Sequence, residues 1–568
     1  MHRCKTRIFL GCALLGAAFF LLVYGSSVLN VSYDAWIFNG YVETDIIQRY
    51  AGWLAYRATD NFIPLTYSKL ISYPFGDYTS LADSIPLAEI FFKLLSPILP
   101  KVFQYEGILA LLNLALQGFC GGLLVSLFTD DSPTIFAGAG LLCLSPVLLE
   151  RIFRHTSLSF HWMLLLAIWL YFRALRSGQL RWVIWQGFLA LFSVGLHLYF
   201  TPMLLGFLAA AALDLRHGRQ KVCAVGIFTG SAGGCLLFAK ALGLLEIGLS
   251  NTSGYGTMGM NLNALFNPVS LDADWWVPGK GRMDWSLFLP PRALAENNLE
   301  SFNYLGIGVL IGLCAAGLLL LFRLWGNSTS RHVLLFSALS FIKRHLFLLL
   351  FALCSTIFAV SNVICAFSHV LLRVPLPQLL LSIFSAFRAS GRLFWGVYYL
   401  LFLSWIVLWI RLPAKRRGAR LALIFLCLLQ LVDLSPTLLQ KHNQLSRPLT
   451  ASIQEKGDAL LAALDGRHTL YFLEPNDDRA LCGWLLRAGV SNNLPLISRE
   501  GYGVAALEEE RLRVQSVLLK GESPYPDCGY LTADPDLAAK LSADGKLVQI
   551  ENVGWLLLPA EGSQTSSE

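Results

Sequence analysis

The sequence predicts an all-α polytopic membrane protein that carries a small α/β domain at its C-terminal end. Hydrophobic residues make up 55% of the 568 positions, and charged residues only 14%. Apolar runs of roughly 17–25 residues recur along the chain, and runs of this length cross a hydrocarbon core of about 30 Å as helices. After about residue 439 these runs stop, and charged residues, glycine and aspartate become frequent.

We expect about eleven membrane-spanning helices within a domain that covers residues 1–438. The first is an uncleaved helix, because its apolar stretch is longer than a signal core and no small-residue cleavage site follows it. The run 182–213 divides at HLYFTP, since Pro202 suits the first turn of a second helix. The predicted spans lie near residues 8–29, 105–128, 133–149, 157–175, 182–196, 199–213, 222–245, 303–322, 345–361, 393–411 and 420–436.

Charge placement predicts the orientation of these spans. Lys and Arg crowd one set of connections, near residues 3–7, 173–181, 216–221, 323–344 and 415–420, and short basic connections stay in the cytoplasm. The N-terminus is therefore expected inside, and an odd number of spans puts the C-terminus outside. The formal charge of +7 indicates topology, with membrane lipids and not nucleic acid as its partner.

The outward side is expected to hold a long first loop and the C-terminal domain. The first outer loop covers about 30–104 and ends in IPLAEIFFKLLSPILP, a short, proline-bounded stretch that we expect along the membrane interface. In the domain 439–568, HTLYFLEP and KLVQIENVGWLLLPA indicate strands, and PDLAAKLSADGK indicates a helix. Cys482 and Cys528 form a disulfide there or remain two buried thiols.

The first loop supplies carboxylates that suit chemistry. In TDIIQRYAGW, Asp45 and Arg49 share one face of a helix at i,i+4, and Asp45 is the candidate catalytic residue. Asp83 comes shortly before Pro86, so it either caps a helix there or takes part in binding.

A second group of candidates follows the third predicted span, in ERIFRHTSLSFHW. Arg151, Arg154 and His155 together suit a phosphate clamp, because arginine presents paired donors to phosphate oxygens. The alternative is a girdle of side chains that reach the interface. His161 follows in the next span, and Glu150 precedes the group.

Three further residues are expected on the same outer face. His197 marks the break between two short helices, and such breaks are tolerated at membrane depth where they line a protein cavity. Arg388 and Arg392 lie in FRASGR, before a predicted span. A carboxylate with several His and Arg at one membrane face suits a reaction on a lipid-linked phosphate, in which the carboxylate takes a proton from an acceptor hydroxyl.

A metal is left open by the sequence. A divalent cation, Mg²⁺ or Mn²⁺, held by Asp45 and a second acid would fit the reaction, but no metal-ligand spacing establishes one.

Several motifs together resemble a known family of bacterial multi-spanning membrane proteins (DUF6311-like). They occur in order: TDIIQRYAGW, DSIPLAEIFFKLLSPILPKVFQYEG, RHTSLSFHW, LFNP, ESFNYLGIGVL and FRASGRLFW. That family in turn resembles the GT-C glycosyltransferase superfamily. The resemblance implies a polyprenyl-phosphate-linked sugar donor, a glycan, lipid or protein acceptor, an inverting transfer outside the bacterial inner membrane, and Asp45 as the loop acid.

Two other functions remain open. A transporter or flippase for a lipid-linked glycan would use the same Arg and His side chains. Against it, the sequence has no evident internal two-fold repeat and no GxxxxGK[ST] motif. A non-catalytic assembly protein would tolerate Asp45→Asn.

Overall fold

The computed structural model describes residues 2–39, 44–215, 218–246, 254–269, 284–325, 328–412, 416–446, 451–475, 478–494, 504–525, 527–541 and 545–559. They form mainly helices, with a small sheet near the C-terminal end of the chain. The chain divides into two units. The helical unit comprises Met1–Leu29, Tyr105–Phe238 and Leu249–Leu445, and the sheet unit comprises Asn30–Gln104, Ala239–Gly248 and Ser446–Glu568.

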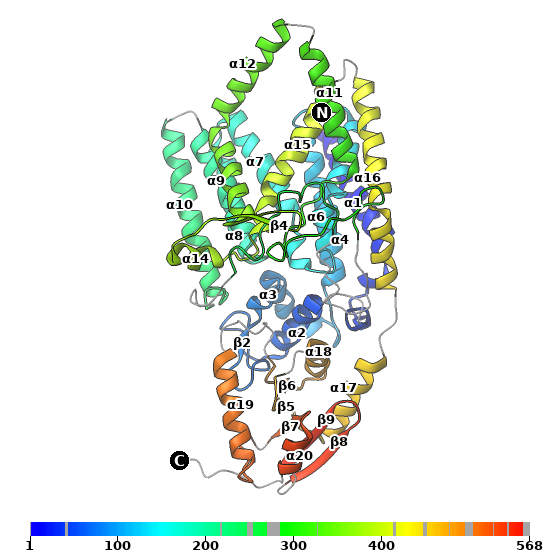
Figure 1. The fold of residues 1–568 in the computed structure, drawn as a ribbon, viewed down its shortest axis with the longest axis vertical. Helices are drawn as coiled ribbons and strands as arrows, with labels where there is room; N and C mark the ends of the chain where they lie inside the picture. Colours follow the sequence, from blue (N-terminus) through cyan, green and yellow to red (C-terminus); the bar gives the residue numbers. More distant parts are fainter. Residues whose placement is uncertain are drawn as a thin grey trace. The chain divides into compact units, whose positions relative to one another are not determined.

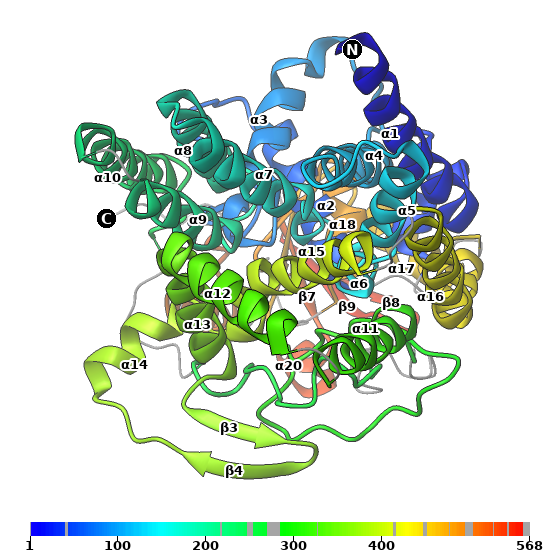
Figure 2. The same cartoon turned by 90° about the horizontal axis from the view of Figure 1, so that it is seen from above.

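Long helices make up most of the helical unit and run side by side (Figure 1). Seen from above, α15 lies among α4, α5, α7 and α11, and the β3–β4 hairpin lies at the edge (Figure 2). The helices are α1 (His2–Tyr24), α4 (Glu106–Val125), α5 (Ser132–Cys143), α6 (Pro146–Arg151), α7 (Trp162–Ser177), α8 (Leu180–Val194), α9 (Phe200–Asp214), α10 (Gly218–Ala241), α11 (Ile307–Trp325), α12 (Ser328–Arg344), α13 (Leu346–Val360), α14 (Gln378–Ser385), α15 (Trp395–Arg411) and α16 (Arg416–Leu445), with β3 (Val363–Ala366) and β4 (His369–Arg373).

Within the described residues, six helices are long and apolar enough to cross a membrane, which fits a multi-pass membrane protein. They are Lys5–Tyr24, Glu106–Val125, Thr156–Ser177, Gly218–Ala241, Ser390–Arg411 and Arg416–Leu445. The number becomes seven if Phe336–Arg344 and Leu346–Val360, which meet at a bend of 80°, form one span. Four shorter apolar helices accompany them, at Ser132–Cys143, Leu180–Val194, Phe200–Asp214 and Ile307–Phe322.

Proline positions explain two differences from the predicted spans. The run 133–149 is two helices, because Pro146 has no N–H; the carbonyl of Leu142 accepts instead from Gln117 Nε2 at 3.0 Å. By contrast, α16 continues through Pro436 to Leu445, nine residues beyond the predicted end. There Ser435 Oγ donates to the carbonyl of Val432 at 2.8 Å, which replaces the bond that proline lacks.

The region 328–344 also differs from its predicted form. The sequence indicates a basic connection, whereas the structure forms helix α12, whose centre VLLFSALSFI is apolar. His345 sits at the bend into α13, and its Nδ1 lies 2.7 Å from Tyr171 Oη.

Glycine allows α1 and α4 to pack closely. A Cβ at Gly16 would lie 2.0 Å from the carbonyl oxygen of Leu114, and one at Gly118 would lie 2.1 Å from that of Cys12. Small residues at such crossings are typical of helices that pack in a membrane.

The sheet unit is built around a five-stranded sheet in the order β6-β5-β7-β9-β8. β5 pairs in parallel with β6 and β7, and β9 pairs antiparallel with β7 and β8. The strands predicted in HTLYFLEP and KLVQIENVGWLLLPA and the helix predicted in PDLAAKLSADGK are confirmed. Those elements are β5 (Thr469–Phe472), β6 (Ser491–Asn492), β7 (Cys528–Thr532), β8 (Gly545–Ile550), β9 (Gly554–Pro559), α17 (Ala451–Ala463), α18 (Arg479–Arg487), α19 (Val504–Leu518) and α20 (Pro535–Leu541).

The long first loop folds as part of this same unit. It contributes α2 (Thr44–Ala58), β1 (Tyr67–Ser68), β2 (Asp77–Tyr78), α3 (Pro86–Leu94) and the short turn η4 (Ser96–Ile98). The segment 70–73 extends the sheet beyond β6, since Asn492 N donates to the carbonyl of Leu70 at 3.1 Å and Tyr73 N donates to that of Asn492 at 3.1 Å. The sequence division at 438/439 falls inside α16, and the structural division follows Leu445.

The disulfide between Cys482 and Cys528 is not formed. Both residues are free and buried. Cys482 lies on α18 with its Sγ 3.3 Å from Asn492 Oδ1, whereas Cys528 begins β7 and packs in the core around Tyr471 and Tyr530. The two thiols therefore have different neighbours, and the alternative of two buried thiols describes them.

Candidate functional site

A short helix and the turn after it present the candidate phosphate-binding side chains. α6 ends at Arg151, and the N–H groups of Arg154 and His155 both donate to the carbonyl of Arg151, at 3.2 and 2.9 Å. Phe153 adopts a φ of 60° in this turn, and its ring packs on that of Tyr24 with centroids 5.2 Å apart. Burial of this ring holds a backbone conformation that a bulky residue rarely adopts.

A carboxylate and an ammonium group hold the end of α6 and the turn that follows it. Glu150 accepts from Arg154 Nη1 at 2.7 Å and from the indole N–H of Trp285. Lys441 of α16 lies 3.5 and 3.3 Å from the carbonyls of Glu150 and Ile152. A cation at the C-terminal end of a helix is stabilised by the unpaired carbonyls there.

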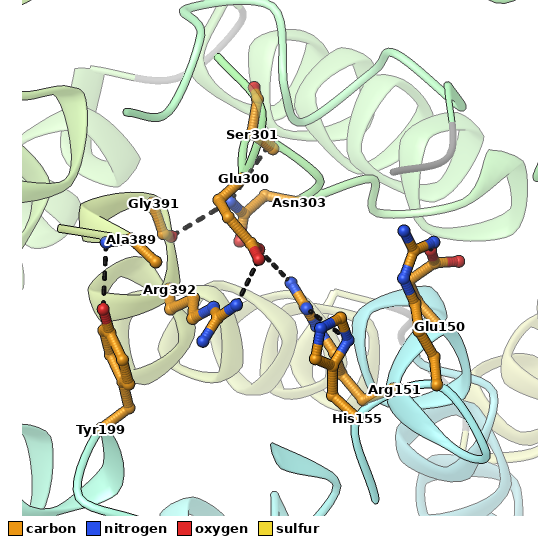
Figure 3. A network of polar contacts seen from close by, with 11 residues as sticks. Glu150, Arg151, His155, Tyr199, Glu300, Ser301, Asn303, Ala389, Gly391 and Arg392 are labelled. Atoms are coloured by element: carbon orange, nitrogen blue, oxygen red, sulfur yellow. Dashed lines mark hydrogen bonds and ion pairs between the residues drawn. The ribbon is translucent and has the colours of Figure 1, made fainter. Parts of the chain in front are cut away.

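The centre of the site is Glu300, which two guanidiniums share (Figure 3). Arg151 Nη2 donates to Glu300 Oε2 at 2.5 Å, and Arg392 Nη2 donates to Oε1. Gly391 permits this approach, because a Cβ there would lie 2.3 Å from the carbonyl oxygen of Glu300. Arg151 Nη1 also lies 3.3 Å from His155 Nδ1.

Aromatic rings hold both guanidiniums. Arg151 Cζ lies 5.3 Å from the ring centre of Trp395, and Arg392 Cζ lies 4.9 Å from that of Tyr199. Tyr199 in turn accepts from the N–H of Ala389 at 3.0 Å (Figure 3). Stacking of this kind is worth about 0.5–2 kcal/mol per cation, and more where water is excluded.

The predicted histidines lie around these rings. His161 is fully buried, stacks on Trp395 with centroids 4.6 Å apart, and its Nδ1 lies 2.9 Å from Tyr399 Oη. His197 lies in the break between α8 and α9, which confirms the predicted division there, and its Nδ1 accepts from the N–H of Tyr199 at 3.2 Å. Arg388 precedes the turn that carries Arg392, and its Cβ packs close to Gly254.

The two arginines keep the carboxyl group of Glu300 ionised. Burial raises the pKa of Glu300, but the charges of Arg151 and Arg392 outweigh it, so this pKa lies well below its usual range. Arg151 is 1% exposed, and its Nε has no hydrogen-bond partner among the described residues. The Nε–H group of Arg151 is therefore a buried donor, close to the carboxylate that Arg151 and Arg392 share.

The loop carboxylates lie in the sheet unit and make other contacts. Asp45 Oδ1 lies 3.3 Å from Arg479 Nη1, which also donates to Gln48 Oε1. Arg49 is fully buried and Nη1 lies 3.3 Å from Asp83 Oδ2. Asp45 and Arg49 thus lie on one helix, where Arg479 contacts the first and Asp83 contacts the second.

Asp83 does not cap α3. The helix begins at Pro86 as predicted, but its N-cap residue is Ile85, with no side-chain cap. Asp83 has a φ of 57° and contacts Arg49, and its part in binding stays a prediction.

No group of three or more His, Cys, Asp and Glu side chains that could hold a metal is found among the residues with described positions. The guanidinium of Arg479 contacts the Asp45 carboxylate, with Nη1 3.3 Å from Oδ1.

Several residues with close contacts in these clusters were not singled out from the sequence, among them Glu300, Lys441, Trp285 and Arg479. Glu300 is the first residue of ESFNYLGIGVL, one of the motifs that carry the family resemblance, and that motif was the available signal. Lys441 and Arg479 have no such signal, because their contacts join positions 291 and 434 residues apart.

Comparison with known families assigns the chain. A model of the family described as "Domain of unknown function (DUF6311)" matches residues 13–435, which is more than half of the chain. The chain therefore belongs to the DUF6311 family, as its motifs predict. Comparison with curated proteins gives no match.

Proposed function

We propose that this DUF6311 protein is an integral-membrane glycosyltransferase that uses a polyprenyl-phosphate-linked sugar donor at the extracytoplasmic face. The buried group of Arg151, Glu300 and Arg392 carries the proposal. Two guanidiniums share one carboxylate there, and Arg151 has an unused buried donor. Paired N–H donors match phosphate oxygens, and burial strengthens their effect on an anion.

The charge change of the reaction suits this group. A new bond forms between the acceptor oxygen and the anomeric carbon, while the bond from that carbon to the phosphate oxygen breaks. The donor phosphodiester carries one negative charge, and the released polyprenyl phosphate carries up to two. Guanidiniums that Glu300 already orients therefore favour the transition state over the bound donor.

Roles follow from position. Arg151, Arg154 and His155 are the proposed phosphate-side groups, and Arg388 and Arg392 are secondary donors. His161 and His197 support the rings that hold them.

Asp45 is the proposed base, which would take the proton of the acceptor hydroxyl. Its side chain is 27% exposed, and Arg479 Nη1 lies 3.3 Å from its Oδ1. The GT-C resemblance supports an acid at this place in the first loop, and a bound Mg²⁺ or Mn²⁺ at Asp45 is the alternative use of the same carboxylate.

We also propose eleven crossings, and the contacts within the sheet unit support this number. The carbonyl of Leu242, just after α10, accepts from Thr66 Oγ1 at 3.0 Å and from Ser80 Oγ at 2.6 Å. The loop before α4 and the end of α10 must therefore face the same side. The number of crossings between them is then even, which favours six (α4, α5, α7, α8, α9 and α10) over the three long helices alone.

The same reasoning supports the later crossings. Segment 70–73 pairs with Asn492, so the first loop and the C-terminal domain face one side. The number of crossings between α10 and the C-terminal domain must then also be even. Four crossings, by α11, α13, α15 and α16, meet this requirement. Together with α1 they total eleven, which leaves the N-terminus and the basic connections in the cytoplasm and the sheet unit outside.

The decisive experiment is transfer by purified protein in liposomes with a panel of polyprenyl-phosphate sugars, with and without a chelator. Wild type is compared with Asp45→Asn and Arg151→Lys, and with Asp536→Asn as a matched control at an exposed carboxylate. We expect transfer by wild type and the control, and a loss of at least tenfold in the two site variants.

Other outcomes would favour the alternatives. Donor movement between leaflets without transfer for any sugar would indicate a flippase. Unchanged transfer by a stable Asp45→Asn protein would remove Asp45 from the mechanism. A protein with neither activity, and tolerant of Asp45→Asn in cells, would be an assembly protein.

A further inference from the structure

The charged side chains of helix α3 point into the sheet unit. Glu89 is fully buried and accepts from Thr79 Oγ1 at 2.7 Å. Lys93 Nζ donates to the carbonyls of Tyr56, Thr59 and Asn61 at 2.6, 2.8 and 3.0 Å, around the end of α2. Both charged side chains of α3 therefore have their bonding partners within the sheet unit.

The opposite side of α3 and η4 exposes large apolar side chains. Phe91 is 56% exposed, Leu94 is 63% exposed, and Ile98 is 80% exposed. A soluble helix has the reverse polarity, because apolar surface in contact with water is unfavourable.

We propose that Phe91, Leu94 and Ile98, the α3 surface, insert into the boundary between lipid headgroups and acyl chains. Chain connectivity favours lipid as the occupant, because the apolar helix α4 begins at Glu106, eight residues after Ile98. Eight residues span at most about 28 Å. Glu89 is the only acid in residues 86–100, and it points away from this surface.

The sheet unit would thereby have a membrane contact of its own, independent of the proposed sugar transfer. Amphipathic segments of this kind bind by their buried apolar area. The sequence predicts an interfacial stretch here, and the side-chain directions now identify which residues would enter the lipid.

Photocrosslinking in the full-length protein tests the α3 surface. p-Benzoylphenylalanine replaces Phe91 or Leu94 in protein reconstituted into phosphatidylethanolamine–phosphatidylglycerol liposomes, and mass spectrometry detects lipid adducts after illumination. Leu512 of α19 is the matched control, since it is an apolar residue of the same unit that is 59% exposed.

We expect at least fivefold more lipid adduct at positions 91 and 94 than at 512. Equal yields at the three positions would overturn the proposal, and so would crosslinks from 91 and 94 to protein instead of lipid. The two positions are independent substitutions of exposed residues, so one suffices if the other variant is poorly produced.

Discussion

Arg479 contacts Asp45 across 434 positions of sequence, with Nη1 3.3 Å from Oδ1. A second ion pair at the other end of the same helix joins Arg487 Nε to Asp34 Oδ2 at 2.8 Å. Between the two pairs, the ring of Trp484 meets that of Phe38 edge-on, with centroids 5.5 Å apart. The candidate base therefore sits on a loop helix, α2, whose neighbour α18 comes from the C-terminal part of the chain.

Gly483 of α18 packs against Phe38 and Ile47 of the first loop, and Gly483→Leu should push these residues apart. A Cβ there would lie 3.0 Å from Phe38 Cε1 and 3.5 Å from Ile47 Cγ2. A larger side chain should cost about 1–3 kcal/mol. Thermal unfolding and protease cleavage within 30–104 should both report the loss.

Ala488→Leu serves as the control for this substitution, because Ala488 is exposed just after the same helix. If Gly483→Leu leaves the first loop as resistant to protease as Ala488→Leu does, α2 and α18 do not depend on each other.

The sequence predicts individual elements of the fold but not the contacts between distant parts of the chain. Apolar length and alternation indicate α1, α4, β5 and β9, because each of these patterns is local. The pairing of Asn492 with Leu70, and of Arg479 with Asp45, depends on contacts across most of the chain. No local pattern carries this information.

The candidate site was predictable to a similar degree. Arg151, Arg154 and His155 lie within five positions of one another, so their grouping is visible in the sequence. Glu300 joins this group only because Gly391 lets the loop that carries Arg392 approach the loop that carries Glu300. That approach is a property of the tertiary structure.

Asp77 should make the stability of the sheet unit depend on pH. It is 7% exposed, and burial raises its pKa to about 6, despite the N–H of Tyr78 that donates to it at 2.7 Å. Between about pH 4 and 6, the unfolded chain has lost the proton that the folded chain keeps. Stability therefore falls as pH rises through this window, by at most about 1.4 kcal/mol per pH unit.

Asp77→Asn should remove this dependence, because the amide stays neutral at every pH. The variant is expected to unfold at a higher temperature than wild type at pH 7.5 and to lose that advantage below pH 4. Asp536→Asn is the exposed control. An equal slope of unfolding temperature against pH in wild type and Asp77→Asn would contradict the prediction.

Glu300→Gln should destabilise the helical unit strongly. The amide leaves Arg151 and Arg392 buried without the carboxylate that both contact, and removal of one partner from a buried ion pair costs about 3–5 kcal/mol. Added inorganic phosphate should raise the unfolding temperature of Glu300→Gln more than that of wild type, since it can replace the lost charge.

The control is Glu508→Gln, whose half-exposed carboxylate pairs with Arg511 and should contribute little. If phosphate stabilises Glu300→Gln no more than it stabilises Glu508→Gln, the arginine pair does not bind this anion.

Cys482 and Cys528 should behave as free thiols. Burial raises the pKa of each to about 12, so both should react slowly with maleimide in folded protein. After denaturation without reductant both should label fully, as peptide mass spectrometry would measure. A linked pair of peptides from these two positions would show that the disulfide forms after all.

Cysteine labelling from one side of the membrane tests whether the number of crossings between two positions is even or odd. Lys69 of the first loop and Glu455 of α17 are exposed and belong to the sheet unit, so cysteines placed there must react from the same side. Gly418, in the first turn of α16, should lie on the opposite side if α16 crosses the membrane. A membrane-impermeant maleimide applied to intact cells should therefore label Lys69→Cys and Glu455→Cys but not Gly418→Cys, beyond the labelling of the native cysteines. Opposite results for the first two would contradict the pairing of segment 70–73 with Asn492, whereas labelling of all three would mean that α16 does not cross.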